Sequence, residues 1–518
     1  MGLGRTYGIG LTGLEGRIVE VEADIGQNLP AFILLGLPDA SLNESRDRVK
    51  SAAKNSGLPL SRRKITVNLM PADVHKRGSG FDLAIVMAAL AAAGDIRSTG
   101  KTVFLAELGL DGRLRPLHGV LPSVMAAVDA GFQDIVVAEA NAAEAALVPA
   151  ARVSGFISLA AVAEAFGAGH EHLVFPPAIP PDRQARGLGE EGEGAPRAQL
   201  PDLADIAGQS EARFALEVAA AGAHHLLMTG PPGAGKTMLA ERLPGLLPDL
   251  GDTAAMEVTA IHSLNWRGGP CTGLIRRPPF ESPHHTATAA AVIGGGAGIP
   301  RPGAASRAHR GVLFLDEAPE YEARVLDALR QPLESGTLVL HRAAGTAVYP
   351  ARFQLVLAAN PCPCGLASGK GIDCTCSAQQ RRRYFGRLSG PLLDRVDLQL
   401  EIRRVSLPEF AAAGKAEGTA DVARRVTQAR QRQRKRLAPW GCETNAEVPG
   451  RVLRGALKPE ANATRALDRA MDRQFLTARG YDRVLRVAWS IADLAEHNAP
   501  DADDIGQALG FRQQAVAA

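Results

Sequence analysis

The segment from 230 to 237, GPPGAGKT, has the residue types and the spacing of a loop that binds phosphate. It fits the pattern G-x-x-x-x-G-K-[ST], follows a strand-like apolar run at Leu226–Thr229 and precedes an amphipathic, helix-like run. In such a loop the backbone N–H groups surround phosphate, the lysine reaches the β and γ phosphates, and the hydroxyl binds Mg²⁺. With these flanks, a chance glycine-rich turn is a poor alternative. The residues of the loop are Gly230, Pro231, Pro232, Gly233, Ala234, Gly235, Lys236 and Thr237.

Two acidic residues end a second apolar run, GVLFLDEAPE. We expect Asp316 to hold Mg²⁺ through water and Glu317 to polarise the attacking water, which predicts ATP hydrolysis and not binding alone. A run that ends in Asp-Glu is by itself more often a plain strand end, but a phosphate loop upstream favours the catalytic interpretation. A later strand-like run reaches Asn360, whose side chain would orient water beside the γ phosphate.

Four of the six cysteines lie in one loop, NPCPCGLASGKGIDCTC, which begins at Asn360. Four thiolates can form a tetrahedral zinc site, and zinc would give a fixed shape to a glycine-rich loop with no obvious core. Free thiols and redox pairs remain alternatives, while disulfides are disfavoured in a reducing cytosol. Cys271 and Cys442 stand apart and are interpreted as ordinary thiols. The proposed zinc ligands are Cys362, Cys364, Cys374 and Cys376.

The elements that must position these residues follow from the pattern of the whole chain. A chain of 518 residues is long enough for two or three domains, with cores of Ala, Leu and Val because only 4% of the residues are aromatic. A net charge of +3 argues neither for nor against nucleic acid. The predicted units are an α/β domain at 1–170, a linker at 175–202, a strand–loop–helix ATPase core at 203–402 and a helical lid at 403–518.

Two features interrupt the expected core. The gap from Thr237 to Asp316 is longer than one helix and one strand need, and the excess, Asn265–Gly303, is rich in glycine and proline and predicts an inserted excursion. It contains His284 and His285, for which metal or DNA contact and loop packing both remain open. Downstream, Leu338–Pro361 predicts a hairpin with its tip near Arg342–Gly345.

No targeting signal is evident. The N-terminus lacks the basic start and apolar core of a signal peptide, and the nearest long apolar run, Phe81–Gly94, contains Asp82 and is too short to span a bilayer. These patterns predict a cytoplasmic protein without membrane contact.

Together the motifs resemble the ComM/YifB family of magnesium-chelatase-like AAA+ ATPases. The stretches that carry the resemblance include DIAGQSEARFALEVAAAGAHHLLMTGPPGAGKT, RPPFESPHHTATAAAVIGGG, LAANPCPCG, SGPLLDRVDL and LTARGYDRVLRVAWSIADLAEH. The resemblance implies an AAA+ core with a parallel sheet and a homo-oligomeric ring, a hexamer, with ATP bound between subunits. Asn360 then matches the residue that positions water, and Arg395 matches an arginine finger given to the neighbouring subunit. Arg479 matches a lid arginine that contacts the γ phosphate of its own subunit, with Arg483 as the fallback.

Residues 1–170 resemble the Lon-protease-like (S5-type) domain that this family carries, through ITVNLMPADVHKRGSGFDLAI and LAELGLDGRLRPLHGVLPSVMAAVDAG. A Lon-type protease needs a serine nucleophile and a lysine. Gly80 and Pro122 stand at those two positions, and Ser79 is out of register, so no protease activity is expected.

The resemblance implies DNA as the substrate: ATP-driven translocation and branch migration of recombination intermediates, linked to natural transformation. The sequence adds a basic span at 381–440, with fifteen Lys or Arg and six Asp or Glu, which fits either a phosphate backbone or a solvated helix face. His341 and Arg342 at the hairpin are the candidate DNA contacts. The alternatives are a chelatase-type motor acting with partner subunits and a chaperone-like remodeller of protein complexes.

Overall fold

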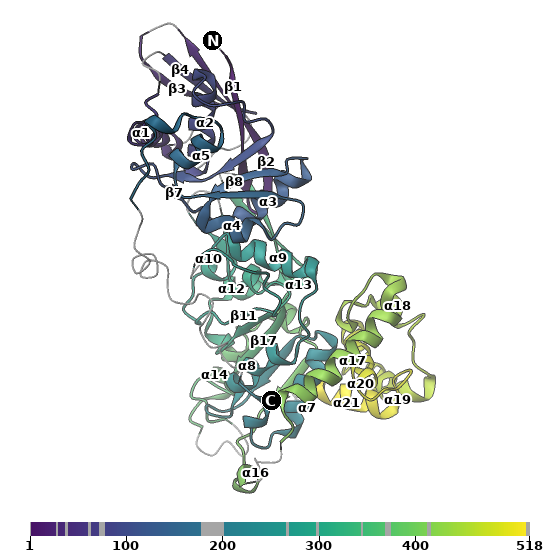
Figure 1. Ribbon diagram of the computed structural model, residues 1–518. Coiled ribbons are helices and arrows are strands. Elements are labelled where there is room, and N and C mark those ends of the chain that lie inside the picture. Colours follow the sequence, from purple (N-terminus) through teal and green to yellow (C-terminus); the bar gives the residue numbers. More distant parts are fainter. Residues whose placement is uncertain are drawn as a thin grey trace.

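Three bodies follow one another along the chain in the computed structural model (Figure 1). The N-terminal residues form the upper body, the residues around the predicted phosphate loop lie below it, and the C-terminal helices lie to one side. The structure describes residues 2–26, 29–36, 40–60, 64–71, 78–177, 201–265, 269–296, 300–342, 345–367, 374–411 and 416–513.

The N-terminal body is a mixed sheet with strand order β3-β4-β2-β1-β5-β8-β9. The long strands β1 and β2 pair in antiparallel fashion, whereas β5, β8 and β9 are parallel. Helix α2 (Asp82–Ala93) is apolar on every side because it is buried against this sheet. The other elements are β1 (Gly4–Thr12), β2 (Glu15–Gly26), β3 (Phe32–Leu35), α1 (Ala40–Asn55), β4 (Lys64–Met70), β5 (Thr102–Leu105), β6 (Glu107–Leu108), β7 (Leu114–Arg115), α3 (Val120–Asp129), β8 (Asp134–Ala138), α4 (Glu139–Ala145), β9 (Arg152–Phe156) and α5 (Leu159–Ala165).

The second body is built on a parallel sheet with strand order β11-β14-β17-β10-β18. Its strands are short and almost wholly apolar, as expected for a sheet covered on both faces. Because the strands are parallel, the residues that follow β10, β14 and β17 meet at one edge. The elements are α7 (Ser210–Gly222), β10 (Leu226–Thr229), α8 (Lys236–Leu246), α9 (Asp252–Ser263), β11 (Phe280–Glu281), β14 (Val312–Leu315), α12 (Ala323–Ala328), α13 (Arg330–Ser335), β17 (Gln354–Ala359), α14 (Ala378–Phe385), α15 (Gly390–Leu393) and β18 (Leu398–Glu401).

The excursion and the hairpin lie beside each other in this body. The excursion contains α10 (Ala289–Val292) and the short pair β12 (Gly294–Gly295) and β13 (Arg301–Pro302), and α11 (Ala304–Arg307) follows it. The hairpin consists of β15 (Thr337–Arg342) and β16 (Gly345–Pro350), and Arg342 pairs with Gly345 at the place where the sequence predicts the tip. The two residues between its strands, 343 and 344, lie outside the described residues.

The C-terminal body is helical and packs on α7 and β18. Its centre is α20, which buries Trp489 among apolar side chains of the neighbouring helices. The elements are α16 (Leu407–Ala411), α17 (Thr419–Leu437), α18 (Gly450–Leu453), α19 (Ala461–Asp472), α20 (Ala478–Leu494) and α21 (Ala502–Gln513).

The upper body contacts the core through α3, α4 and α9. The Gly119 N–H donates to the Ser263 carbonyl at 2.9 Å, and the Ser263 hydroxyl donates to the buried carboxylate of Glu144. Met256 and Ala260 of α9 pack into the apolar cluster of the N-terminal sheet. These contacts give the two bodies a shared core instead of a loose joint.

The α/β fold with a parallel core sheet and C-terminal helices confirms the predicted fold class. The predicted linker at 175–202 falls largely at 178–200, outside the described residues. In the part of the chain that the structure describes, no helix has both the length and the apolar content to cross a membrane.

Candidate functional site

The phosphate loop joins the end of β10 to the start of α8. Gly230 lies so close to β18 that a Cβ there would meet the Ile402 carbonyl oxygen at 2.3 Å, which explains the glycine. Gly235 has φ +91°, a left-handed conformation that turns the chain into α8. The loop therefore presents backbone N–H groups and the helix N-terminus at the carboxyl edge of the sheet, where an anion is stabilised.

Lys236 is the central cation of this loop. Its Nζ donates to the carbonyls of Gly230 and Pro231 at 2.6 and 3.1 Å and to Oδ1 of Asn360 at 3.1 Å. Burial lowers the pKa of Lys236, and the nearby carboxylates of Asp316 and Glu317 oppose that effect. The contact to Asn360 brings the residue at the end of β17 within reach of the same phosphate position as the loop.

Asp316 and Thr237 are also adjacent, with the Thr237 hydroxyl donating to Oδ2 of Asp316 at 2.8 Å. A hydroxyl and a carboxylate at this separation offer the hard oxygen ligands that Mg²⁺ prefers. The donor set thus fits ATP with Mg²⁺, with Lys236 and the loop N–H groups on the phosphates and the two oxygens on the metal.

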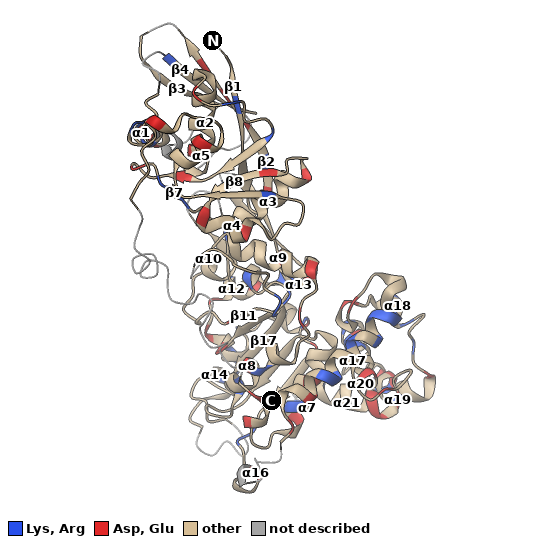
Figure 2. Ribbon diagram, viewed as in Figure 1, with Lys and Arg blue, Asp and Glu red and all other residues tan. Residues whose placement is uncertain are grey.

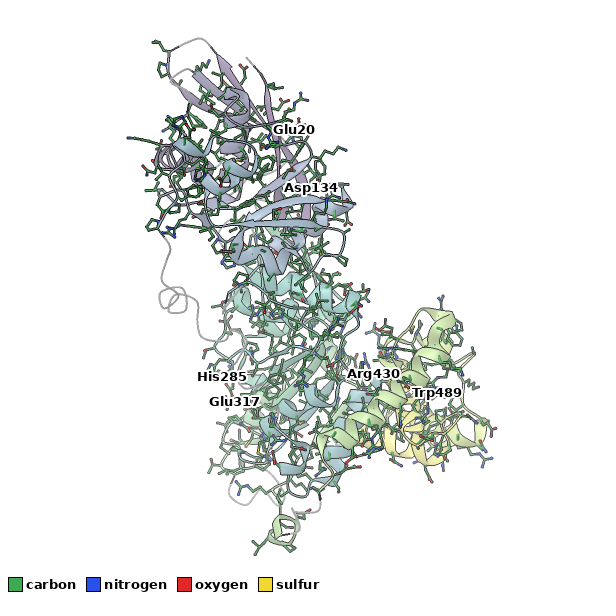
Figure 3. The ribbon with its side chains drawn as sticks, viewed as in Figure 1. Glu20, Asp134, His285, Glu317, Arg430 and Trp489 are labelled. Atoms are coloured by element: carbon green, nitrogen blue, oxygen red, sulfur yellow. The ribbon has the colours of Figure 1, made fainter. Side chains whose placement is uncertain are left out.

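Glu317 follows with φ 51°, a left-handed conformation that is uncommon for a residue with a side chain. Its Oε2 lies 3.0 Å from Nδ1 of His285. Both residues line an open cleft of ≈ 290 Å³ together with Asp316 and the loop 282–284. Figure 3 shows His285 and Glu317 next to each other on the side of the core away from the C-terminal helices. The sequence predicted a role for Glu317 and left His285 unassigned.

Gln209 is a second residue whose role the sequence did not reveal. It adopts a left-handed conformation with φ 50° just before α7. Its side-chain amide donates to the Ala234 carbonyl of the phosphate loop at 2.6 Å. In the sequence, Gln209 is marked only by its place in DIAGQSEARF, a motif that carries the family resemblance but does not predict the contact with Ala234.

The four predicted zinc ligands lie together. Their sulfur atoms are all within 4.8 Å of one another, and the Sγ–Sγ distances from Cys362 are 3.2 Å to Cys364 and 3.7 Å to Cys374. Zinc–thiolate bonds of about 2.3 Å in a tetrahedron imply sulfur–sulfur distances of about 3.8 Å. A hydrogen bond from the Leu366 backbone and contacts with the other thiols lower the pKa of Cys364 to about 6. The cluster therefore fits a tetrahedral metal ion.

This cysteine loop also touches the phosphate loop. A Cβ placed on Gly365 would meet the Pro232 ring at 2.7 Å, so the two loops are in direct contact. Cys362 is fully buried two residues after Asn360. The shape of the cysteine loop is therefore coupled to the position of the residues around the γ phosphate.

The three arginines taken from the family resemblance lie away from the phosphate loop of their own chain. Arg395 and Arg483 lie at the amino end of β18, whereas the phosphate loop follows the carboxyl end of the neighbouring, in-register strand β10. Four residues of strand span roughly 13 Å. Arg479 is exposed one turn before Arg483, at the start of α20.

Arg483 has a structural partner. Burial acts to raise the pKa of Asp397, but Arg483 and His224 outweigh it, so the pKa of this carboxyl falls well below its usual range. Arg395 is largely covered, with its side chain 13% exposed, and pairs with Glu334. The structure thus leaves Arg479 exposed and holds the other two in ion pairs.

At the hairpin, His341 and Arg342 are both exposed. Nδ1 of His341 lies 3.0 Å from the Thr346 hydroxyl across the strands, which fixes the ring. The Arg342 guanidinium lies over Gly295 of β12, where a Cβ would meet Nη2 at 3.0 Å. The strands of the hairpin therefore present a histidine and an arginine beside the undescribed tip.

The basic span is largely committed to intramolecular contacts along α17. Arg425 pairs with Glu217, Arg430 donates to the Ala220 carbonyl, and Arg436 pairs with Asp493 while lying 4.2 Å from the Trp489 ring. Figure 2 shows basic residues on α17 and α18 with acidic residues nearby on α19. These contacts favour α17 as a helix packed within the lid over α17 as a basic surface that binds DNA.

Comparison with known proteins identifies the family. Three family profiles match: "Subunit ChlI of Mg-chelatase" at 21–141, "Magnesium chelatase, subunit ChlI" at 202–410 and "Magnesium chelatase, subunit ChlI C-terminal" at 416–512. The Competence protein ComM of Haemophilus influenzae is 38% identical over 523 residues, which cover 99% of this chain and 98% of ComM. This chain belongs to the ComM/YifB family of magnesium-chelatase-like proteins.

Other relatives extend the match. YifB of Escherichia coli is 40% identical over 506 residues, covering 96% of this chain and 95% of YifB. An uncharacterized protein of Mycobacterium tuberculosis is 49% identical over 515 residues, 99% of each chain. Membership of this AAA+ family supports an ATPase that uses ATP and Mg²⁺, in a family whose members are typically oligomeric.

Proposed function

We propose that this protein is a ring ATPase that translocates on DNA and drives branch migration of recombination intermediates. The observation that carries the proposal is that one body of the chain contains both the predicted ATP site and a hairpin that exposes His341 and Arg342. The chain is also similar along its length to Competence protein ComM. The ring is proposed to be a homohexamer that acts in the cytoplasm without membrane contact. Its cofactors are ATP, Mg²⁺ and a structural zinc ion.

The roles in hydrolysis follow from the contacts of the site. Lys236 and the loop N–H groups hold the β and γ phosphates, and Thr237 with Asp316 holds Mg²⁺. Glu317 polarises the attacking water, and Asn360, next to Lys236, orients it. ATP with Mg²⁺ supplies the phosphoryl group whose transfer to water releases the free energy for movement.

Arg395 and Arg479 are proposed to act at the junctions between subunits of the ring. Because Arg395 and Arg479 lie away from their own phosphate loop, each is proposed to act on ATP held by a neighbouring subunit. For Arg479 this differs from the contact within one subunit that the resemblance implied. A cation brought up from a neighbour neutralises the charge that develops on the leaving phosphate.

The hairpin is proposed to grip the DNA backbone. Arg342→Glu places a negative charge where a phosphate would bind, so it should abolish the stimulation of ATP hydrolysis by single-stranded DNA. The plot of log affinity against log salt should lose about 0.7 in slope for each phosphate contact removed. Both quantities come from ATPase rates and DNA binding measured across a salt series.

A suitable control is Arg46→Glu, since Arg46 is exposed on α1 and pairs with the adjacent Asp47. It makes the same charge change in the N-terminal body and should retain DNA stimulation and salt slope. Full DNA stimulation in Arg342→Glu would contradict the assignment of the hairpin to DNA.

The cysteine cluster is proposed to hold zinc. Purified protein should contain about one zinc per chain, and Cys374→Ser/Cys376→Ser should lose it. Because Gly365 contacts Pro232 and Cys362 follows Asn360, loss of the metal should also lower the ATPase rate. Metal analysis and ATPase assays on the same preparations test both statements. Cys271→Ser should keep its zinc, and a metal-free, fully active protein would refute the site.

Two other motor functions use the same ATP site. A chelatase-type motor is favoured by 30% identity over 186 residues to the Magnesium-chelatase 38 kDa subunit of Rhodobacter capsulatus, although these cover 32% of this chain. A chaperone-like remodeller would act on protein complexes. ATPase rates with and without single-stranded and branched DNA separate the proposals, since only the DNA translocase requires stimulation by both.

A further inference from the structure

The contact between His285 and Glu317 is the strongest feature that the proposed function leaves unexplained. We propose that His285 is a positioning residue that restrains Glu317 until the hairpin β15–β16 is occupied. The restraint rests on the proposed function, because occupation of the hairpin means DNA bound there. His285 is then the residue that links this occupation to hydrolysis.

The geometry of the pair explains the restraint. Nδ1 of His285 lies 3.0 Å from Oε2 of Glu317, within ion-pair distance of the carboxylate. A general base must accept a hydrogen bond from the water it activates. While His285 contacts Oε2, that oxygen of Glu317 is occupied and cannot accept from the water.

The neighbouring residues hold this arrangement in place. Glu317 has a left-handed backbone, which persists only where surrounding contacts fix it. On the other side, the Tyr321 hydroxyl donates to the Pro283 carbonyl and anchors the loop that carries His285. Both partners are thus oriented by their own segments, and one of these segments must move to separate them.

The segment that carries His285 runs directly beneath the hairpin. After His285, helix α10 buries Val292 and Ile293 in the apolar cluster that also contains Leu338 of β15. Glycine then allows close backbone contact, since a Cβ at Gly294 would meet the Leu340 side chain at 2.9 Å. The hairpin strand β15 therefore packs directly against β12.

A hydrogen bond reinforces this connection from the second hairpin strand. The buried hydroxyl of Tyr349 in β16 donates to the Pro300 carbonyl at 2.5 Å, at the start of β13. Both strands of the hairpin thus contact the β12–β13 pair. This pair begins at Gly294, nine residues after His285 in the chain. Movement of the hairpin on binding DNA is transmitted through α10 to the loop that holds His285.

The decisive variant is His285→Ala, assayed as full-length protein at saturating ATP with and without single-stranded DNA. Couplings between sites typically amount to about 5- to 150-fold, so kcat without DNA should rise about fivefold or more and DNA should add little. KM for ATP should change little, because His285 contacts Glu317 and His284 and lies in the cleft beside 282–284, outside the phosphate loop. His285→Gln, whose amide N–H can still donate to Glu317, should keep the low basal rate.

The matched control is His170→Ala. Nδ1 of His170 lies 2.6 Å from Glu164 on the surface of the N-terminal body, so this variant removes a histidine–carboxylate pair remote from the site. It should leave both rates unchanged. Tyr349→Phe tests the connection to the hairpin: DNA binding should persist while the stimulation declines, and full stimulation would overturn that path.

Two outcomes for His285→Ala would overturn the restraint. A fall in kcat both with and without DNA would mean that the histidine supports hydrolysis, and unchanged rates would mean that the contact is idle. If the unaltered protein shows no DNA stimulation, the DNA assignment fails on its own. The basal rate of His285→Ala then still decides whether His285 restrains Glu317.

Discussion

Glu317→Gln should bind ATP with nearly normal affinity and hydrolyse it about 10²- to 10⁴-fold more slowly. The substitution keeps the size of the side chain but removes the negative charge that polarises water. The Thr237–Asp316 contact and the contacts of Lys236 do not involve Glu317, so the phosphate and Mg²⁺ positions should survive. Turnover by phosphate release and affinity by a fluorescent ATP analogue measure the two effects separately.

Lys236→Ala gives the contrasting result, because it removes the cation that contacts the phosphates. It should lose ATP binding as well as turnover. Glu322→Gln is the matched control for charge, since Glu322 is exposed and pairs with Arg324 outside the site. If Glu317→Gln retained turnover within a few fold of the unaltered protein, another group would have to polarise the water.

The sequence predicts the chemical centre well because its residues are local in the chain. The phosphate loop depends on a strand, a turn with special backbone angles and a helix start, all within Leu226–Leu246. Asp316 and Asn360 are predicted because each follows an apolar run, and parallel strands bring such ends to one edge. The strands lie side by side because each is buried in the core, and their continuous apolar runs indicate this burial in the sequence.

Contacts between distant segments could not be predicted in this way. Gln209 reaches Ala234, and His285 reaches Glu317, across loops whose paths depend on the packing of the whole core. Neither residue lies within a periodic helix or strand pattern that would predict where its side chain points. The pattern SPHH marked the histidines as unusual without indicating which of them, if either, faces the acid.

The basic segments illustrate a further limit. A run such as ARQRQRKRL has the same letters whether its arginines face solvent or a neighbouring carboxylate. Arg425 and Arg436 are paired because Glu217 and Asp493 come from α7 and α20, which are distant in the chain. The order of the sheet strands is likewise set by long-range packing, and the pairing of β1 between β2 and β5 was not evident from the sequence.

Arg395→Ala should reduce ATP hydrolysis about 10³- to 10⁵-fold while leaving ATP binding intact, which is the range for removal of an arginine finger. The reason is positional. Arg395 lies at the amino end of β18, and its own phosphate loop lies beyond the carboxyl end of β10, so the role that we propose for it is toward the ATP of a neighbour. In a ring of this variant every subunit binds ATP, but no neighbouring subunit supplies the arginine.

Mixing variants tests this directly. Lys236→Ala subunits cannot hold ATP but still carry Arg395, and Arg395→Ala subunits hold ATP but lack the finger. A mixture should therefore recover activity at every junction where a Lys236→Ala subunit offers Arg395 to its neighbour's ATP. A mixture of Lys236→Ala with Glu317→Gln should stay inactive, because in no subunit do Lys236 and Glu317 occur together. Failure of the first mixture to recover, with mixed rings shown to form, would mean that Arg395 acts within its own subunit or only maintains its ion pair with Glu334.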